Sequence, residues 1–105
     1  NVLIDRIRPM VEKLLNPPVT FEVEAIRRAG DYAYLRVTPI RPTGDPIDVN
    51  QTNLKGKSAG VLTQVVLKKE GDNWNLVAGA VGTKLDWAAA YCLPPYPRDL
   101  TETCK

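Results

Sequence analysis

The chain has 105 residues, a length that suits a single domain built around one hydrophobic core. Apolar residues make up 44% of the sequence and charged residues 25%, which are ordinary values for a globular protein and argue against disorder. The formal net charge of +2 is small and the basic residues are dispersed, so we expect no nucleic-acid partner. No apolar run approaches the roughly 20 residues of a membrane-spanning helix.

Residues 1–16 have the periodicity of an amphipathic helix. Apolar side chains recur three and four positions apart and form one stripe, made of Leu3, Ile4, Ile7, Met10, Val11, Leu14 and Leu15. Pro9 is unfavourable inside a helix because it removes a backbone hydrogen bond, so we expect either a helix that begins near Arg8 or one that is kinked at Pro9. Asn16-Pro17-Pro18 then ends the helix.

The next segment predicts a hairpin with strands over residues 19–28 and 32–40, joined by a turn at Ala29-Gly30-Asp31. Alternation in the first strand places four side chains on one face: Val19, Phe21, Val23 and Ala25. Alternation in the second strand places three apolar side chains inward: Ala33, Leu35 and Val37. The side chains that alternate with them point outward, and they are Tyr32, Tyr34 and Arg36.

A long loop and a second hairpin follow. Residues 41–58 are polar and rich in turn residues, and a loop of this length in a small domain is often functional. Further strands are predicted over residues 60–70 and 74–81, joined by a turn at Gly71-Asp72-Asn73. Residues 19–81 therefore predict a four-stranded antiparallel sheet.

The chain ends with a second helix and a tail. Thr83 is the expected N-cap of a short helix within residues 83–92, and residues 93–105 predict an irregular tail. The whole order of elements predicts a single α+β domain over residues 1–105. In this fold the N-terminal helix lies across the concave face of a curved four-stranded antiparallel sheet, and the short helix closes the chain.

The two cysteines, Cys92 and Cys104, lie near the C-terminus, too far apart for a redox Cys-x-x-Cys motif. A disulfide is the simplest interpretation, because it would pin a proline-rich tail, and it predicts an oxidising compartment, periplasmic or secreted. The alternative is a cytosolic protein with two reduced thiols. Since no signal-peptide pattern is present, we expect an exported form of this sequence to be a mature or trimmed one.

The absence of histidine limits the chemistry of the chain. Histidine is the usual general base near neutral pH and the usual metal ligand. Ser58 is the only serine, and no Ser-His-Asp triad can be built around it. The sequence contains neither a glycine-rich phosphate loop nor a calcium-binding loop pattern. We therefore expect no catalytic triad, no metal site and no cofactor.

Aromatic residues are the first candidates for a binding site. Tyr32 and Tyr34 share one face of a predicted strand, and Arg36 extends that face. If this face is exposed, aromatic rings beside an arginine suit a partner or a ligand. The alternative interpretation is that these side chains lie under the last helix or under the long loop, on the far face of the sheet.

A pocket near the last helix is the second candidate. Asp86 and Trp87 are adjacent at the start of that helix. A carboxylate such as Asp86, together with a tyrosine such as Tyr34 or Tyr91, could serve an isomerase or a dehydratase if a deep pocket lies between helix and sheet. The alternative role of Asp86 is to stabilise the helix N-terminus by its negative charge.

Several short motifs occur in a fixed order: Arg8-Pro9-x-Val11-Glu12, Pro18-Val19-x-Phe21-x-Val23, Gly30-Asp31-x-Ala33, Gly44-Asp45-Pro46-Ile47, Trp74-x-Leu76-Val77-Ala78-x-Ala80-Val81-Gly82 and Leu85-Asp86-Trp87. With them the chain resembles a group of small, mostly exported bacterial proteins of unassigned function. The layout is also similar to the cystatin-like and nuclear-transport-factor-like arrangement of a helix on a bent sheet. The resemblance implies export and a fold, and it implies no activity or functional residue.

Three functional hypotheses follow. The first is a non-enzymatic binding or accessory domain, bacterial and extracytoplasmic, which binds a protein partner through the aromatic face or the long loop. Separately, the edge strands of an open four-stranded sheet invite pairing with another copy, so we also expect a homodimer. The second is a small pocket enzyme or ligand-binding protein of the isomerase or dehydratase kind. The third is a proteinase inhibitor, which rests on the cystatin-like layout alone.

Overall fold

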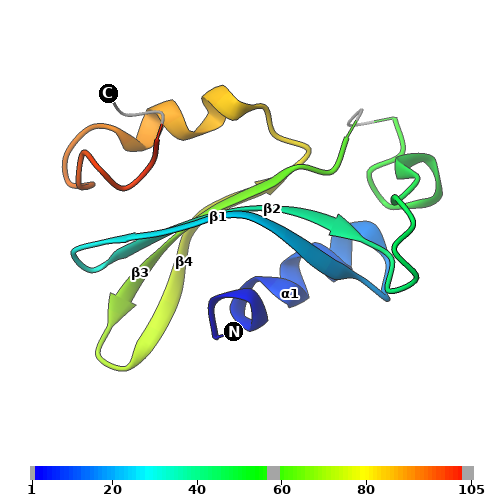
Figure 1. The fold of residues 1–105 in the computed structure, drawn as a ribbon, viewed down its shortest axis with the longest axis horizontal. Helices are drawn as coiled ribbons and strands as arrows, with labels where there is room; N and C mark the ends of the chain where they lie inside the picture. Colours follow the sequence, from blue (N-terminus) through cyan, green and yellow to red (C-terminus); the bar gives the residue numbers. More distant parts are fainter. Residues whose placement is uncertain (1, 57–59, 103–105) are drawn as a thin grey trace.

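A computed structural model describes residues 2–56 and 60–102, and within them it confirms the α+β fold class. The chain forms, in order, α1 (Val2–Leu15), β1 (Thr20–Ala29), β2 (Tyr32–Ile40), the 3-10 helix η1 (Val49–Gln51), β3 (Thr63–Glu70), β4 (Asn73–Val81) and the 3-10 helix η2 (Leu85–Tyr91). The strands make one antiparallel sheet in the order β1-β2-β3-β4, so that β1 and β4 are its two edges among the described residues (Figure 1).

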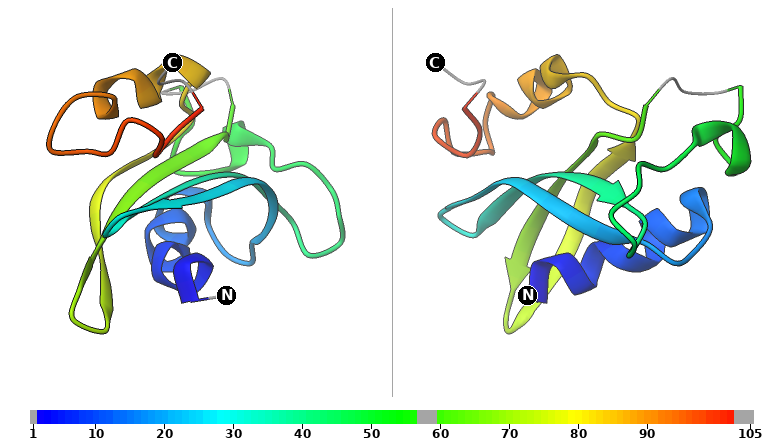
Figure 2. Two further views of the ribbon diagram at one scale, coloured as in Figure 1. Left: turned by 60° about the vertical axis from the view of Figure 1, so that its left-hand side comes forward. Right: turned by 45° about the vertical axis from the view of Figure 1, so that its right-hand side comes forward.

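The molecule has three layers. α1 covers one face of the sheet, and the C-terminal segment, which we define as residues 84–102, lies over the opposite face (Figure 2). The short helix η2 begins this segment. Because the two sheet faces are covered by different parts of the chain, side chains that alternate along a strand enter two separate cores.

α1 runs without a break from Val2 to Leu15 with Pro9 inside it, so a helix that begins near Arg8 is the wrong one of the two alternatives. The helix ends at Leu15, and it is followed by Asn16, whose φ of 61° lies in the left-handed region and whose backbone N–H donates to the carbonyl of Glu12. Arg41 then donates to three backbone carbonyls at this end of the helix, those of Leu15, Asn16 and Pro18. These bonds supply partners for carbonyl groups that a helix end leaves open.

The layer between α1 and the sheet is filled by apolar side chains. Leu3 and Ile7 of α1 pack against the β2 and β3 residues Ala33, Leu35, Val37, Val65 and Leu67. Further along the helix, Val11 and Leu15 pack against Ile47 and Leu54. These last two residues come from the predicted loop 41–58, of which residues 41–56 are described, so this loop closes one end of the core.

β1 contains a bulge that the simple alternation misses. Val23 lies opposite Val37 and Ala25 lies opposite Arg36, so Glu24 is an extra residue in β1. The prediction that Val23 and Ala25 share a buried face is therefore wrong: Val23 is 51% exposed, and Ala25 faces the side of the C-terminal segment. Ile26, opposite Leu35, takes the place on the α1 face that alternation assigned to Ala25.

The C-terminal segment differs from its prediction in detail. Its helix is a 3-10 helix over Leu85–Tyr91, with Lys84 rather than Thr83 at the N-cap position. The hydroxyl of Thr83 donates instead to the carbonyl of Leu62, 3.1 Å away. The segment packs on the sheet through a small core of four buried side chains: Tyr34, Val66, Ala88 and Leu100.

Candidate functional site

Tyr34 and Arg36 lie on the sheet face that the C-terminal segment covers, as does Tyr32. Their common face is as predicted, since Ala33, Leu35 and Val37 point toward α1. Tyr34, however, is only 1% exposed and packs against Ala88 and Leu100. Tyr34 therefore takes no part in an open aromatic surface. The structure agrees with the alternative interpretation, in which this face of the sheet lies under the last helix.

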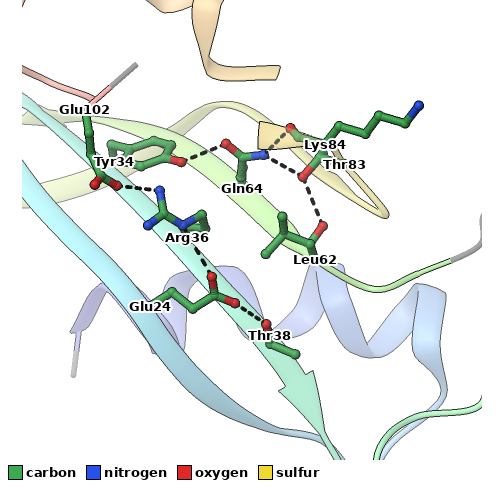
Figure 3. A network of polar contacts seen from close by, with 9 residues as sticks. All are labelled: Glu24, Tyr34, Arg36, Thr38, Leu62, Gln64, Thr83, Lys84 and Glu102. Atoms are coloured by element: carbon green, nitrogen blue, oxygen red, sulfur yellow. Dashed lines mark hydrogen bonds and ion pairs between the residues drawn. The ribbon is translucent and has the colours of Figure 1, made fainter. Parts of the chain in front are cut away.

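The buried hydroxyl of Tyr34 starts a chain of hydrogen bonds (Figure 3). It donates to Oε1 of Gln64 at 2.7 Å, and Nε2 of Gln64 donates at 2.7 Å both to Oγ1 of Thr83 and to the carbonyl of Lys84. Gln64 is fully buried in β3, so its amide needs partners on both sides. The chain of bonds ties β2 and β3 to the start of the C-terminal segment.

Arg36 makes the second part of the network. Its Nε lies 3.4 Å from Oε1 of Glu24, and its Nη1 is paired with Glu102 at the end of the C-terminal segment (Figure 3). Glu24 also accepts a hydrogen bond from the hydroxyl of Thr38. Because Glu24 is the extra residue of the bulge, these contacts from β2 hold the bulge in place.

Two pKa values are shifted in this network. Burial raises the pKa of Tyr34 above its ordinary value of 10.0, although Arg36 acts in the opposite direction. Burial acts to lower the pKa of Arg36, but its hydrogen bonds to Glu102 and Tyr34 outweigh that effect and raise it. Near neutral pH, Tyr34 therefore stays a neutral donor and Arg36 stays charged, which suits both groups to holding the fold.

The predicted aromatic residues Tyr32 and Trp87 belong to a row of rings on the same face. Trp87 lies 4.9 Å from Tyr91 between ring centroids, Tyr91 lies 5.1 Å from Tyr96, and Tyr96 lies 5.2 Å from Tyr32. The two contacts that Tyr96 makes are edge-to-face. The rings therefore contact one another, and these contacts fasten the C-terminal segment to β2.

Asp86 is exposed on η2, and η2 lies on the opposite side of the sheet from α1. Asp86 therefore lies outside the layer between α1 and the sheet, and that layer holds Leu, Ile, Val and Ala side chains. Cys92 follows η2 as its C-cap. Cys104 lies outside the described residues, so the disulfide with Cys92 stays a prediction.

The outer edge of β1 has two exposed apolar side chains on one face. α1 contacts β4 more than any other strand: Nε of Arg6 donates to the carbonyl of Trp74 at 2.7 Å, and Met10 lies beside Gly79. The β1 side of the same face is consequently less covered, and Val23 and Ile26 are 51% and 37% exposed there. We call the outer side of Thr20–Ala29 the β1 edge.

Charges are divided along the β1 edge. Glu22 and Glu24 lie in its first half, and Arg27 and Arg28 lie in its second half. The exposed apolar residues Val23 and Ile26 lie between Glu22 and Arg27. The edge therefore presents an acidic end, an apolar centre and a basic end to any strand that pairs with it.

Three residues of the network were not singled out from the sequence: Thr38, Gln64 and Glu102. Gln64 carries a detectable signal, because it is a polar residue inside the apolar run of β3. Glu102 carries none, since only the folded C-terminal segment brings it to Arg36, 66 positions away in the sequence.

The described residues contain neither a metal-ion site nor a membrane-spanning helix. No group of three or more Asp, Glu, Cys or His side chains is placed to hold a metal ion, and no helix there has the length and apolar character to cross a membrane. Comparisons of the chain with protein-family models, with curated proteins and with solved structures found no match.

Proposed function

We propose that this chain is a non-enzymatic binding domain that binds an extended polypeptide strand at the β1 edge. The observation that carries the proposal is the exposure of Val23 and Ile26, two large apolar side chains on one face of an edge strand. An edge strand offers a row of backbone N–H and C=O groups to an added strand, and neighbouring apolar side chains supply selectivity.

The polar network supports this choice of surface over the covered face. Tyr34, Gln64 and Thr83 use their hydrogen-bonding groups on one another and on backbone carbonyls. If one of these groups turned to a ligand, its present hydrogen bond would break and a buried polar group would lose its partner, which costs about 1–3 kcal/mol. Binding at the β1 edge disturbs none of these bonds.

An exported, bacterial origin belongs to the same proposal. It is supported by the short motifs that resemble small exported proteins and by the position of Cys92 at the end of η2, from which a disulfide could fasten the tail. A domain outside the cytoplasm with an open strand edge suits an accessory role, in which it holds another polypeptide.

A labelled peptide tests strand binding without knowledge of the partner. The probe is a fluorescein-labelled copy of residues 20–29, which is apolar at its centre and carries its charges in the order that antiparallel pairing with the β1 edge needs. The control is the same peptide with its two Glu and two Arg residues exchanged, which sets like charges against Glu22 and Arg27. We expect the probe to bind in about the 10–100 µM range and the control about tenfold more weakly, by fluorescence anisotropy.

Two variants locate the binding on the protein. Val23→Lys places a charge in the apolar centre of the β1 edge, and Val77→Lys makes the same change at a 41% exposed position on the other edge strand, β4. Loss of peptide binding in the first variant alone supports the proposal. Equal binding of both peptides, no binding of either, or the same loss in both variants would contradict it.

A further inference from the structure

We infer that the strand bound at the β1 edge is β1 of a second copy of this chain, which makes the protein a symmetric dimer with one continuous eight-stranded sheet. The inference rests on the proposed function and names its partner. It is carried by the self-complementarity of the sequence of β1 when that strand is laid antiparallel against itself.

In one register of this pairing, every two residues that lie opposite each other are on the same face of the sheet. In this register Glu22 lies opposite the second copy's Arg27, and Val23 lies opposite its Ile26. The two-fold symmetry produces each of these pairs twice, with the two copies exchanged. Glu22 and Arg27 both point to the face of the C-terminal segment, since their partners in β2 are Thr38 and Tyr34. Val23 and Ile26 both point to the α1 face, since their partners are Val37 and Leu35.

The bulge makes this register possible. In a regular strand, residues three apart point to opposite faces, and an opposing pair such as Val23 and Ile26 would not match. The extra residue Glu24 brings them to one face. Shifting one strand by one residue in either direction sets residues of different faces opposite each other, for example Val23 against Arg27 or Val23 against Ala25. The two-fold axis therefore passes between Glu24 and Ala25.

The pairing places complementary chemistry at each contact. Glu22 meets Arg27, which is half-buried beside the C-terminal segment on one face, and Val23 meets an isoleucine on the other, so no like charges are directly opposed. Two-fold symmetry about an axis normal to the sheet puts both copies of α1 on one face and both C-terminal segments on the other. A contact limited to ten-residue strands and four apolar side chains is smaller than a standard interface, so we expect a reversible dimer.

A charge exchange tests the register. Glu22→Arg and Arg27→Glu each place two pairs of like charges across the two-fold axis, so each variant alone is expected to stay monomeric. In a mixture, the four charges become two complementary pairs, and heterodimers form. We expect sedimentation velocity to show association of the wild type between about 10 µM and 1 mM, and association of the mixture at least about tenfold tighter than that of either variant alone.

The outcomes separate this inference from the function on which it rests. Arg27 also donates to the carbonyl of Asp99, so circular dichroism must first show that its variant is folded. If it is not, Val23→Lys with Val77→Lys as the control replaces it, and only the former is expected to abolish association. A wild type that binds the residue 20–29 peptide but stays monomeric overturns the second copy as partner. A wild type that does neither overturns both proposals, and a mixture no tighter than its components overturns the register.

Discussion

Val23 and Ile26 are three positions apart in β1, yet their side chains lie on the same face of the sheet. Their partners in β2, Val37 and Leu35, are two positions apart and both point toward α1. The extra residue Glu24 accounts for the difference, and Arg36 and Thr38 hold its carboxylate. A bulge in an edge strand thus creates an apolar pair that a regular strand of this sequence would split between two faces.

Replacing Tyr34 by Phe tests the buried network. The change removes the donor to Oε1 of Gln64 and leaves that buried acceptor without it. We expect the free energy of unfolding, measured with urea, to fall by about 1–3 kcal/mol. Tyr32→Phe is the matched control, because the Tyr32 hydroxyl makes no hydrogen bond within the described part of the chain, and we expect it to change stability by less than about 0.5 kcal/mol. Equal losses in the two variants would show that the bond to Gln64 contributes nothing.

The same tyrosine predicts a dependence of stability on alkaline pH. Its folded-state pKa is raised above the ordinary 10.0 because burial disfavours the tyrosinate. The stabilising contribution is therefore complete below pH 10.0 and is lost as the pH rises toward the folded-state pKa, since the unfolded chain releases its proton first. Urea unfolding between about pH 8 and pH 11 should show the wild type losing stability faster than Tyr34→Phe. Parallel curves for the two proteins would contradict this.

Gly79 is required by close packing between β4 and its neighbours. A Cβ atom at this position would lie 2.7 Å from Cγ1 of Val65, which is fully buried, and 3.4 Å from Sδ of Met10. We expect Gly79→Ala to lower the free energy of unfolding by about 1–3 kcal/mol. Gly60→Ala adds the same methyl group where no heavy atom of the described chain lies within 4 Å, and it should stay within about 0.5 kcal/mol of the wild type. A harmless Gly79→Ala would mean that Val65 and Met10 can move apart.

A thiol assay tests the predicted disulfide between Cys92 and Cys104. We expect the denatured, unreduced protein to show no reactive thiol, and reduction to lower the free energy of unfolding by about 2–3 kcal/mol, as for a short closed loop. The compartment follows from the result, because an intact disulfide fits an extracytoplasmic protein. Two reactive thiols per chain before reduction would contradict the prediction.

Much of the fold could be predicted from local patterns. The stripe of apolar residues led by Leu3 and Ile7 identified α1, and alternation around Leu35 assigned both faces of β2 correctly. These patterns succeed because each element buries one face, and the residues on that face recur at a fixed spacing within a short stretch of sequence. The helix includes Pro9, although the local effect of a proline could not decide between the two predicted forms of the helix.

The candidate site was less predictable because long-range contacts determine it. The bulge at Glu24 depends on Arg36 and Thr38 in another strand, and without it Val23 is assigned to the core. The burial of Tyr34 depends on Leu100, far away in the sequence. Periodicity within one element contains neither fact, so the exposed residues of the β1 edge became visible only in the folded chain.

Amide hydrogen exchange of the wild-type protein at low and high concentration tests the central claim most directly, because it reports protection strand by strand. If the β1 edge pairs with the β1 edge of a second copy, raising the concentration from about 10 µM to about 1 mM slows exchange within Thr20–Ala29 and leaves the other edge strand, Asn73–Val81, unchanged. Slowed exchange in Asn73–Val81 with none in Thr20–Ala29, or no change in either strand, would contradict the claim.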